Sequence, residues 1–371
     1  AESITPNAKQ STMKPISQNW LARGHAEGAP LVDERTATFV WQGAEPPLLR
    51  GDWNDWDEAS PLPWRRVAGG RRRPTAESSW IATLELAPDA YMEYCLGADE
   101  HRVDDPLNPR RVSNGLGQFN HWFYMPQGGP TPLARRTRGV AQGELIRLDL
   151  PTRQWVAGQQ RRLILYRPAV EQPTPLLLVY DGPDYLRRAS LATLVDNLIA
   201  QRRIQPIALA MLANGRGSRM AEYAGSDATL GFVHELVLPA ARQQLDLIDI
   251  TQEPGAFGVM GASMGGLMAL ATGLRLPQLF GRVLSQSGAF HLGPYPTTAV
   301  ELVEQGPVRP LRIWLDVGRY EELLASNRDT HALLQARGYE VSYREFSAGH
   351  NYTAWRDDLW RGLEALFPPV N

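Results

Sequence analysis

The chain has 371 residues, which is long enough for two domains and at least one large hydrophobic core. Its hydrophobic and charged fractions are close to globular averages, and a formal net charge of −2 gives no sign of a nucleic-acid partner or a membrane surface. No apolar run approaches the ~20 residues that span a bilayer, and we expect no signal peptide because the start lacks a charged segment followed by an apolar core.

The first third of the chain has the pattern of a small all-β domain. Residues 1–30 are polar, with one short helix expected around Gln18–Arg23, and the arginine run at residues 71–73 is expected in a solvated loop. Several short strands separated by turn formers predict an Ig-like (E-set) β-sandwich of roughly 100 residues. Partial alternation and aromatic residues place these strands at Thr36–Gln42, Pro47–Asp52, Trp80–Leu86 and Tyr91–Leu96.

A stretch rich in glycine and proline, residues 127–132, is suited to a linker. We therefore expect an N-terminal β-sandwich domain with a polar arm at residues 1–130, a linker at 131–142 and a second domain at 143–371. From residue 143 onward, predicted strands and helices alternate, which favours an α/β domain with a mostly parallel sheet and helices on both faces. Strands are predicted at residues 162–166, 176–180, 207–212, 257–260, 283–286, 311–317 and 340–346, and helices at 191–203, 232–247, 323–337 and 353–366.

One segment of the second domain, Val259–Gly265, contains a G-x-S-x-G motif centred on Ser263. An apolar stretch precedes the motif and a helical run follows it, so we expect a strand, a tight turn and a helix. Such a turn lifts the serine above the sheet, and small neighbours let the backbone bend that sharply. The helix N-terminus favours negative charge that develops beside the serine. This context indicates a nucleophilic serine.

The chain order nucleophile, acid, histidine selects His350 as the base among seven histidines. Four histidines precede Ser263, His291 follows it too closely, and His331 lies in a pattern typical of a surface helix. His350 lies on a loop after the last predicted strand and before the final helix, where this architecture keeps its base.

The acid is expected after the strand that ends near Gly318. Asp316 lies inside the strand, Glu321 lies in the loop beyond it, and Glu322 also fits the first turn of a helix, where it would complement the dipole. We favour Glu321, with Asp316 as the alternative. Its role would be to orient the imidazole and to stabilise the imidazolium.

Several segments together resemble the esterase D and enterochelin esterase family of α/β-hydrolases. The N-terminal third resembles the sandwich domain of enterochelin esterases through Thr38–Trp41, Gly51–Trp56 and Asp105–Pro109. The second domain carries the resemblance in Leu178–Gly182, Gly261–Gly266, Ser285–Gly288, Gly349–Asn351 with Trp355–Arg356, and Arg219–Tyr223 with Glu235–Pro239. The resemblance covers nearly the whole chain.

This resemblance implies an α/β-hydrolase fold with Ser263 as nucleophile, His350 as base and Glu321 as acid. It also implies that Met264 N–H is one donor of the oxyanion hole. The second donor is expected from the residue after Gly182, which is Pro183 and has no N–H. Gly182 or Asp184 is the expected replacement if the loop is shifted.

The substrate is expected beyond the C-terminal ends of the strands, where open α/β sheets bind ligands. Arginines suit an anionic iron–tris-catecholate complex through charge-assisted hydrogen bonds. The residues expected to bind substrate are Arg187, Arg188, Arg216, Arg219, His291 and Trp355.

Other roles are open for these arginines. Arg187 and Arg188 equally fit an exposed helix face, and Arg216, between two glycines, fits a solvated loop tip. Arg219 is expected to pair with Glu222 and so shape the loop.

The resemblance implies a serine esterase that opens the ester bonds of a catecholate trilactone siderophore and releases iron. No metal or organic cofactor is expected, because iron enters only as part of the substrate. The expected partner is thus a ferric siderophore or another small ester, with no nucleic acid and no membrane. Cys95, the single cysteine, rules out an internal disulfide and suits the cytoplasm, where we expect the protein.

The alternative is a carbohydrate or feruloyl esterase whose sandwich binds sugar, since the sandwich also resembles glycogen-binding modules. Trp53 and Trp56 would then form the sugar platform, although packing and a domain interface are their favoured roles. A non-catalytic binding protein on a hydrolase scaffold is a third class. The set Ser263, Glu321 and His350 disfavours that class, whereas Pro183 keeps it open.

Overall fold

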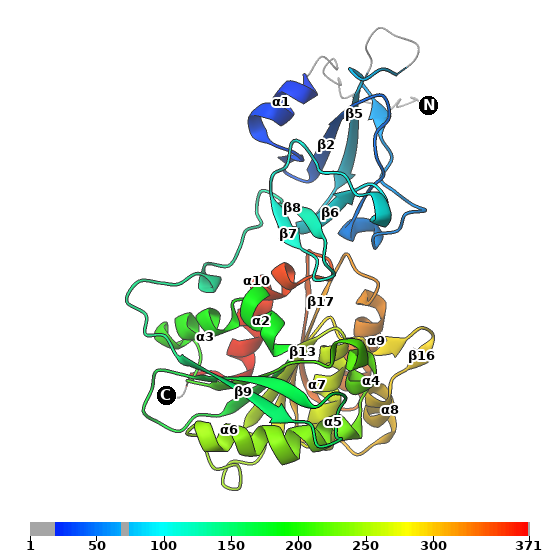
Figure 1. Cartoon of the computed structure of the whole chain (residues 1–371). Coiled ribbons are helices and arrows are strands. Elements are labelled where there is room, and N and C mark those ends of the chain that lie inside the picture. Colours follow the sequence, from blue (N-terminus) through cyan, green and yellow to red (C-terminus); the bar gives the residue numbers. More distant parts are fainter. Residues whose placement is uncertain (1–18, 68–73, 370–371) are drawn as a thin grey trace, which may run out of the picture.

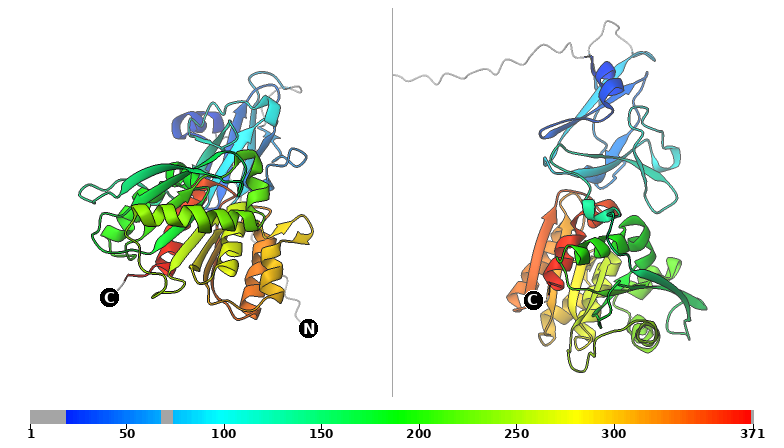
Figure 2. Two further views of the ribbon diagram at one scale, coloured as in Figure 1. Left: turned by 60° about the horizontal axis from the view of Figure 1, so that its bottom comes forward. Right: turned by 90° about the vertical axis from the view of Figure 1, so that its left-hand side faces the viewer.

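The computed structural model, which describes residues 19–67 and 74–369, has two regions that lie end to end (Figure 1). Two small sheets form the N-terminal region, and a larger α/β region follows. Figure 2 shows the same arrangement from the side. The expected short helix is present as α1 (Trp20–Glu27), while Gln18 and the arginine run at 71–73 lie outside the described residues.

The N-terminal region contains two four-stranded antiparallel sheets. The first has the order β1-β2-β5-β4, with β1 Leu31–Asp33, β2 Thr36–Gln42, β5 Ser79–Glu85 and β4 Arg65–Arg66. The second has the order β3-β6-β8-β7, with β3 Leu49–Gly51, β6 Tyr91–Leu96, β8 Phe119–Tyr124 and β7 Arg111–Ser113.

One apolar cluster joins the two N-terminal sheets. Phe39 of the first sheet packs edge-on against Tyr94 and Phe123 of the second, with ring centroids 5.0 and 5.8 Å apart. Trp53 packs against the same cluster, 5.5 Å from the Phe39 ring. The packing role favoured for Trp53 is therefore confirmed.

The α/β region is built on an eight-stranded sheet of order β18-β17-β14-β13-β11-β12-β10-β9. Six neighbouring strands are parallel, and β10 pairs antiparallel with both β12 and β9. The predicted mostly parallel sheet is confirmed. The strands are β9 Glu144–Pro151, β10 Gln160–Arg167, β11 Leu176–Tyr180, β12 Ala208–Leu212, β13 Phe257–Ala262, β14 Phe280–Gln286, β17 Arg312–Gly318 and β18 Glu340–Phe346.

Helices cover both faces of this sheet, as predicted. One face carries α2 Gly182–Arg188, α3 Leu191–Ala200 and α10 Tyr352–Leu366. The other carries α4 Arg219–Tyr223, α5 Asp227–Phe232, α6 Leu238–Gln244, α7 Met264–Arg275, α8 Thr298–Gln305 and α9 Leu324–Ala336. A short hairpin, β15 His291–Leu292 and β16 Tyr295–Pro296, projects beside α8.

The sheet is buried on both faces, which explains why its strands are continuous apolar runs. In β11, Leu176, Leu178 and Tyr180 join the apolar cluster on one face, while Leu177 and Val179 join the other. The alternation of side chains along a strand supplies both cores.

One predicted helix differs from the structure. The helix expected at residues 232–247 starts earlier, with α5, passes through a π-helical stretch at Val233–Val237 and ends with α6 at Gln244. Pro239 explains the wide turn, because it has no N–H to donate to the preceding turn and its ring crowds the carbonyl there.

The linker expected at residues 131–142 lies against the α/β region. Leu133 is buried in the cluster with α3, and Asn197 Nδ2 donates to its carbonyl at 2.8 Å. Thr131 N donates to Asp357 Oδ1 of α10 at 3.0 Å. Within the described ranges, none of the helices is both long and apolar enough to cross a membrane.

Candidate active site

Ser263 stands between β13 and α7, on the strand–turn–helix that the motif predicts. Its backbone has φ 59° and ψ −125°, a sparsely populated conformation for a residue with a side chain. Ser263 N donates to Gln286 O of β14 at 2.9 Å, which ties the turn to the neighbouring strand. Gly261 permits the bend, since a Cβ on it would lie 2.4 Å from Gly265 O.

His350 and Glu321 form a hydrogen-bonded pair beyond the ends of β18 and β17. His350 Nδ1 lies 2.5 Å from Glu321 Oε2. A carboxylate can only accept, so Nδ1 carries the proton and Nε2 is left as an acceptor. Glu321 is 7% exposed, and its Oε1 accepts hydrogen bonds from Gly318 N at 2.5 Å and Ser287 Oγ at 2.6 Å.

Trp355 supports the Glu321–His350 pair through contacts with Ser287 and with the His350 ring. Its Nε1 donates to Ser287 Oγ at 3.0 Å, and its ring packs edge-on to the His350 ring at 4.9 Å. Ser287, which the sequence did not single out as a site residue, therefore links Trp355 to Glu321. Its place at the end of β14, one strand from Ser263, was the available signal.

Asp316, the alternative acid, points elsewhere. Its Oδ2 accepts hydrogen bonds from Trp314 Nε1 at 2.8 Å and Gln286 Nε2 at 3.3 Å. Burial, and then the nearby charge of Asp358, raise the pKa of Asp316 well above its ordinary value. It has no hydrogen bond to His350 among the described residues.

Met264 and Gly182 carry two of the backbone amides expected at the oxyanion hole. Met264 opens α7 and Gly182 opens α2, so both N–H groups lie at helix N-termini, where amides lack intrahelical acceptors. Asp181, before Gly182, has left-handed φ 54°, and Pro183 falls in the first turn of α2, a position that tolerates a missing N–H.

A cavity of about 600 Å³ lies between the C-terminal edge of the large sheet and the N-terminal region. Ser263 and His350 both line it, and the Ser263 hydroxyl makes no hydrogen bond with any residue that the structure describes. Half of the lining residues come from the N-terminal region and half from the α/β region.

The structure brings two of the four expected arginines to this cavity. Arg188 lies over the Tyr352 ring at 4.4 Å and donates to Ser113 O at 3.0 Å. Arg219 Nη2 lies 2.6 Å from Asp181 Oδ2. Trp355 also lines the cavity.

The predicted pair of Arg219 and Glu222 is wrong. Glu222 instead accepts from Arg161 of β10 at 2.7 Å, and both of these side chains are buried. The two residues are three apart on the short helix α4, but Arg219 reaches toward the end of β11 while Glu222 reaches toward β10.

Arg187, Arg216 and His291 are not among the residues that line the cavity. Arg187 is exposed and contacts Asp184 at 3.2 Å on its own helix, so the helix-surface role fits it. Arg216 is exposed in a 3₁₀ turn, and His291 lies on the β15–β16 hairpin.

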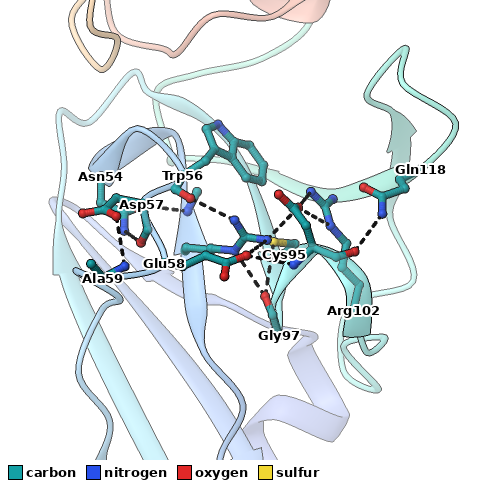
Figure 3. Close-up of polar contacts among 12 residues, drawn as sticks. Asn54, Trp56, Asp57, Glu58, Ala59, Cys95, Gly97, Arg102 and Gln118 are labelled. Atoms are coloured by element: carbon teal, nitrogen blue, oxygen red, sulfur yellow. Dashed lines mark hydrogen bonds and ion pairs between the residues drawn. The ribbon is translucent and has the colours of Figure 1, made fainter.

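The N-terminal wall of the cavity was not predicted from the sequence. Arg50 and Arg102 both contact Asp99 Oδ1, each at 2.7 Å. Arg50 also donates to Trp56 O at 2.9 Å, and Figure 3 shows the contacts around Trp56 and Arg102. Trp56 lines the cavity, in agreement with the domain-interface role favoured for it.

This architecture agrees with the similarity of the chain to known proteins. Residues 156–366, more than half of the sequence, match the family of putative esterases. The chain belongs to this esterase family.

Known relatives of the chain extend the match toward the N-terminus. The iron(III) enterobactin esterase of Dickeya dadantii (strain 3937) is 30% identical over 291 residues, which cover 71% of this chain and 65% of that protein. The aligned part thus spans slightly less than two thirds of the Dickeya protein. The iron(III) enterobactin esterase of Escherichia coli (strain K12) is 24% identical over 407 residues, which cover 97% of this chain and 98% of that protein.

Solved structures share the fold of this chain. The enterobactin esterase of Shigella flexneri, determined in the presence of enterobactin, matches with a TM-score of 0.74 at 21% identity and covers 97% of this chain and 100% of that chain. A ferulic acid esterase of Anaeromyces mucronatus matches with a TM-score of 0.54 at 15% identity and covers 66% of this chain and 97% of that chain. The two-region architecture is therefore shared with the Shigella structure over nearly its full length.

Proposed function

We propose that the protein is a serine esterase that hydrolyses the ester bonds of a catecholate trilactone siderophore, such as ferric enterobactin, and thereby releases iron. The observation that carries this proposal is the match to an iron(III) enterobactin esterase over 97% of the chain, which includes the N-terminal sheets as well as the α/β region. The cavity between these two regions supports it, because both walls are then available to a large branched ester.

In the proposed reaction, Ser263 Oγ attacks an ester carbonyl carbon while its proton passes to His350 Nε2. The carbon–oxygen bond to the leaving alkoxide breaks, and His350 returns the proton to that oxygen, which leaves an acyl-enzyme. A water molecule then gives a proton to His350 and attacks the acyl carbon. The bond from that carbon to Ser263 Oγ breaks and His350 returns the proton to Oγ, so that a carboxylic acid and free Ser263 result. Glu321 holds the Nδ1–H and stabilises the imidazolium.

Met264 N–H and Gly182 N–H are the proposed donors of the oxyanion hole. Both lie at helix N-termini, where the dipole also favours the negative charge of the tetrahedral intermediate. In this proposal Gly182 replaces Pro183, which has no N–H, as the second donor.

Arg188 is the proposed contact for the anionic part of the substrate. It is half-buried, lines the cavity and forms no ion pair with the described residues, so its charge is available to a ligand. Arg219 is already paired with Asp181, and its proposed role is to shape the cavity wall.

Mass spectrometry of the products tests the proposal. Ferric enterobactin, its glucosylated and bacillibactin relatives, and feruloylated sugars are incubated separately with wild type and with Ser263→Ala. The expected result is stepwise opening of the trilactone, with the mass of one water gained per ester, by wild type alone. Turnover of feruloylated sugars without turnover of any siderophore would contradict the proposal.

A carbohydrate or feruloyl esterase is the second candidate, supported by the shared α/β fold and by Trp56 on the cavity wall. A two-tryptophan sugar platform is not available, because Trp53 packs into the N-terminal core.

Four further assignments are part of the proposal. They are the domain division at residues 131–142, the Ig-like sandwich, the cytoplasmic location and a reaction without a metal or organic cofactor. The cluster shared by the two N-terminal sheets supports the sandwich, and the proposed chemistry uses protein groups and water alone.

A further inference from the structure

Asp52 is a buried carboxylate of the N-terminal region whose side chain reaches the loop that carries His350. It follows β3 directly and is 3% exposed. Its Oδ2 accepts hydrogen bonds from Glu93 N at 2.8 Å and from Asn351 Nδ2 at 3.3 Å. Its Oδ1 accepts from Trp56 Nε1 at 3.2 Å. Both oxygens are thus fixed, and one of their donors lies next to His350.

The residues on either side of His350 both contact Asp52. On one side, a Cβ on Gly349 would lie 2.3 Å from Asp52 Cγ, so a glycine is needed for the loop to approach this closely. On the other side, Asn351 donates to Asp52 through Nδ2, while its Oδ1 accepts from Ala354 N at 2.9 Å and caps α10. One side chain therefore joins Asp52 to the helix that follows His350.

Two further contacts attach the same loops to the N-terminal sheets. Tyr91 N donates to Ser347 O at 3.0 Å, three residues before His350. Ala87 N donates to the hydroxyl of Tyr320 at 3.1 Å, and Tyr320 directly precedes Glu321. The loops of both members of the Glu321–His350 pair are therefore held by one region of the chain.

We propose that Asp52 is a positioning residue, which fixes the His350 loop through Gly349 and Asn351 so that the imidazole faces Ser263. The inference rests on the proposed function, in which Ser263 and His350 are nucleophile and base. Asp52 has no part in the reaction itself and lies 299 residues before Asn351 in the chain. The N-terminal region would thus contribute to catalysis by keeping His350 aligned with Ser263.

The environment of Asp52 supports this role. Burial, and then the nearby Glu93 carboxyl, raise the pKa of Asp52 well above its ordinary value, so the fold keeps an acid where an apolar residue would be easier to bury. A base must lie within hydrogen-bond reach of its nucleophile, and a displacement of ~1 Å can cost about 100-fold in rate.

A double-mutant cycle on Asp52 and Asn351 tests the proposal. The substrate is p-nitrophenyl butyrate, a small ester whose turnover does not require binding of a siderophore. Asp52→Ala removes the acceptor. Asn351→Ser keeps a side-chain oxygen that can cap α10 but removes the amide that donates to Asp52. The matched control is Asp57→Ala, which removes an exposed carboxylate from the same loop. Its side chain accepts from Ala59 N and has no hydrogen bond to the His350 loop among the described residues.

Each single variant should lower kcat about 20-fold with little change in KM. The double variant should be no worse than either, because both changes remove the same Asn351–Asp52 hydrogen bond. Asp52→Asn should recover part of the activity, since its amide oxygen can still accept from Glu93 N and Asn351, while its amide nitrogen loses the contact with Trp56 Nε1. The rate at which a fluorophosphonate labels Ser263 should fall in parallel with kcat, while Asp57→Ala matches wild type.

Normal kcat in Asp52→Ala, or additive losses in the double variant, would overturn the proposal. If Asp52→Ala does not fold by circular dichroism, Asn351→Ser and Asp52→Asn decide: unchanged kcat in Asn351→Ser overturns the proposal. Wild type without ester turnover or labelling would instead overturn the proposed function, and this inference with it.

Discussion

The two walls of the cavity satisfy their charged groups in different ways. On the N-terminal wall, Arg50 and Arg102 share Asp99, so these charges are paired before a ligand arrives. On the α/β wall, Arg188 forms no ion pair with the described residues, and the Ser263 hydroxyl has no hydrogen bond with them. The N-terminal wall also holds two buried acids without an ion pair to the described residues, Asp52 and Glu93, and burial raises the pKa of both. The cation without an ion pair and the strained nucleophile lie on the α/β wall.

This difference separates two tasks. The α/β wall carries groups that can react or bind an anion, whereas the N-terminal wall, whose arginines are paired, contributes shape and holds the loops of Glu321 and His350. Changes on the α/β wall should therefore act directly on chemistry or on binding of the anion. Changes on the N-terminal wall should act through alignment or through stability.

The largest effect is expected at Ser263. Ser263→Ala should keep the fold and lower ester turnover by about 10⁴-fold or more, because only the oxyanion hole and binding remain. Turnover of p-nitrophenyl butyrate and labelling by a fluorophosphonate probe measure this. Ser326→Ala, on α9 and away from the cavity, is the control. Labelling on a peptide without Ser263 would show that the reactive group is another residue.

The next largest effect separates Glu321 from Asp316. In Glu321→Gln the single amide oxygen is held by the donors Gly318 N and Ser287 Oγ, so the amide nitrogen faces His350 Nδ1 and disfavours the required tautomer. The change should lower kcat by about 10³- to 10⁴-fold. Asp316→Asn should lower kcat by less than about tenfold, because its partners are Trp314 and Gln286 rather than His350. Steady-state kinetics with circular dichroism as a folding check measure both variants, and the reverse ranking would make Asp316 the acid.

Much of the α/β region could be predicted because its strands are buried on both faces. Such strands are unbroken apolar runs, and β11 was predicted at its observed bounds. β1, β4 and β7 have only two or three residues, too few for a period to show, and they were missed. β9 was also missed, although its half-buried and exposed positions largely alternate, as expected of an edge strand.

In the candidate site, too, the residues with a local sequence signal could be predicted, whereas contacts between distant segments could not. Ser263, Glu321 and His350 follow from a local motif, chain order and loop position, and the structure brings Glu321 and His350 into contact. The contact of Asp52 with the loop after β18 could not be predicted, because nothing near Asp52 in sequence signals a partner so far along the chain. Arg219 shows the same limit: its acid is Asp181 on another element, not Glu222 on its own helix.

The pH dependence of the free energy of unfolding should reveal the buried carboxyl of Glu93 on the N-terminal wall. Burial raises the pKa of Glu93 from 4.5 to about 7, so the folded protein holds this proton more tightly than the unfolded chain does. The contribution of Glu93 to stability is therefore full below pH 4.5 and is lost as the pH rises through 7. Between these values the loss is at most about 3 kcal/mol.

Glu93→Gln should remove this pH dependence and raise the stability at pH 8. A glutamine oxygen can still accept from Asn120 and its amide can donate to the Tyr91 hydroxyl, so the hydrogen bonds of Glu93 survive the change. Urea unfolding of wild type and variant from pH 4.5 to 8 measures the difference. A constant difference across this range would show that Glu93 has no raised pKa.

The smallest expected effect tests Arg188 against its neighbour Arg187. Arg188→Ala should raise KM for ferric enterobactin about tenfold, because a half-buried charged hydrogen bond is lost, and should leave KM for p-nitrophenyl butyrate unchanged. Arg187→Ala is the matched control, since Arg187 is exposed and outside the cavity lining.

Ionic strength sharpens this test. Salt screens charges over ~8 Å at physiological ionic strength, so KM for the anionic siderophore should rise with added salt in wild type and in Arg187→Ala. The rise should be smaller in Arg188→Ala, because the unpaired cation is gone, and absent for the neutral ester. If the two arginine variants respond alike, the anion is not bound at Arg188. The α/β wall then differs from the N-terminal wall in its reactive groups but not in offering a cation to the ligand.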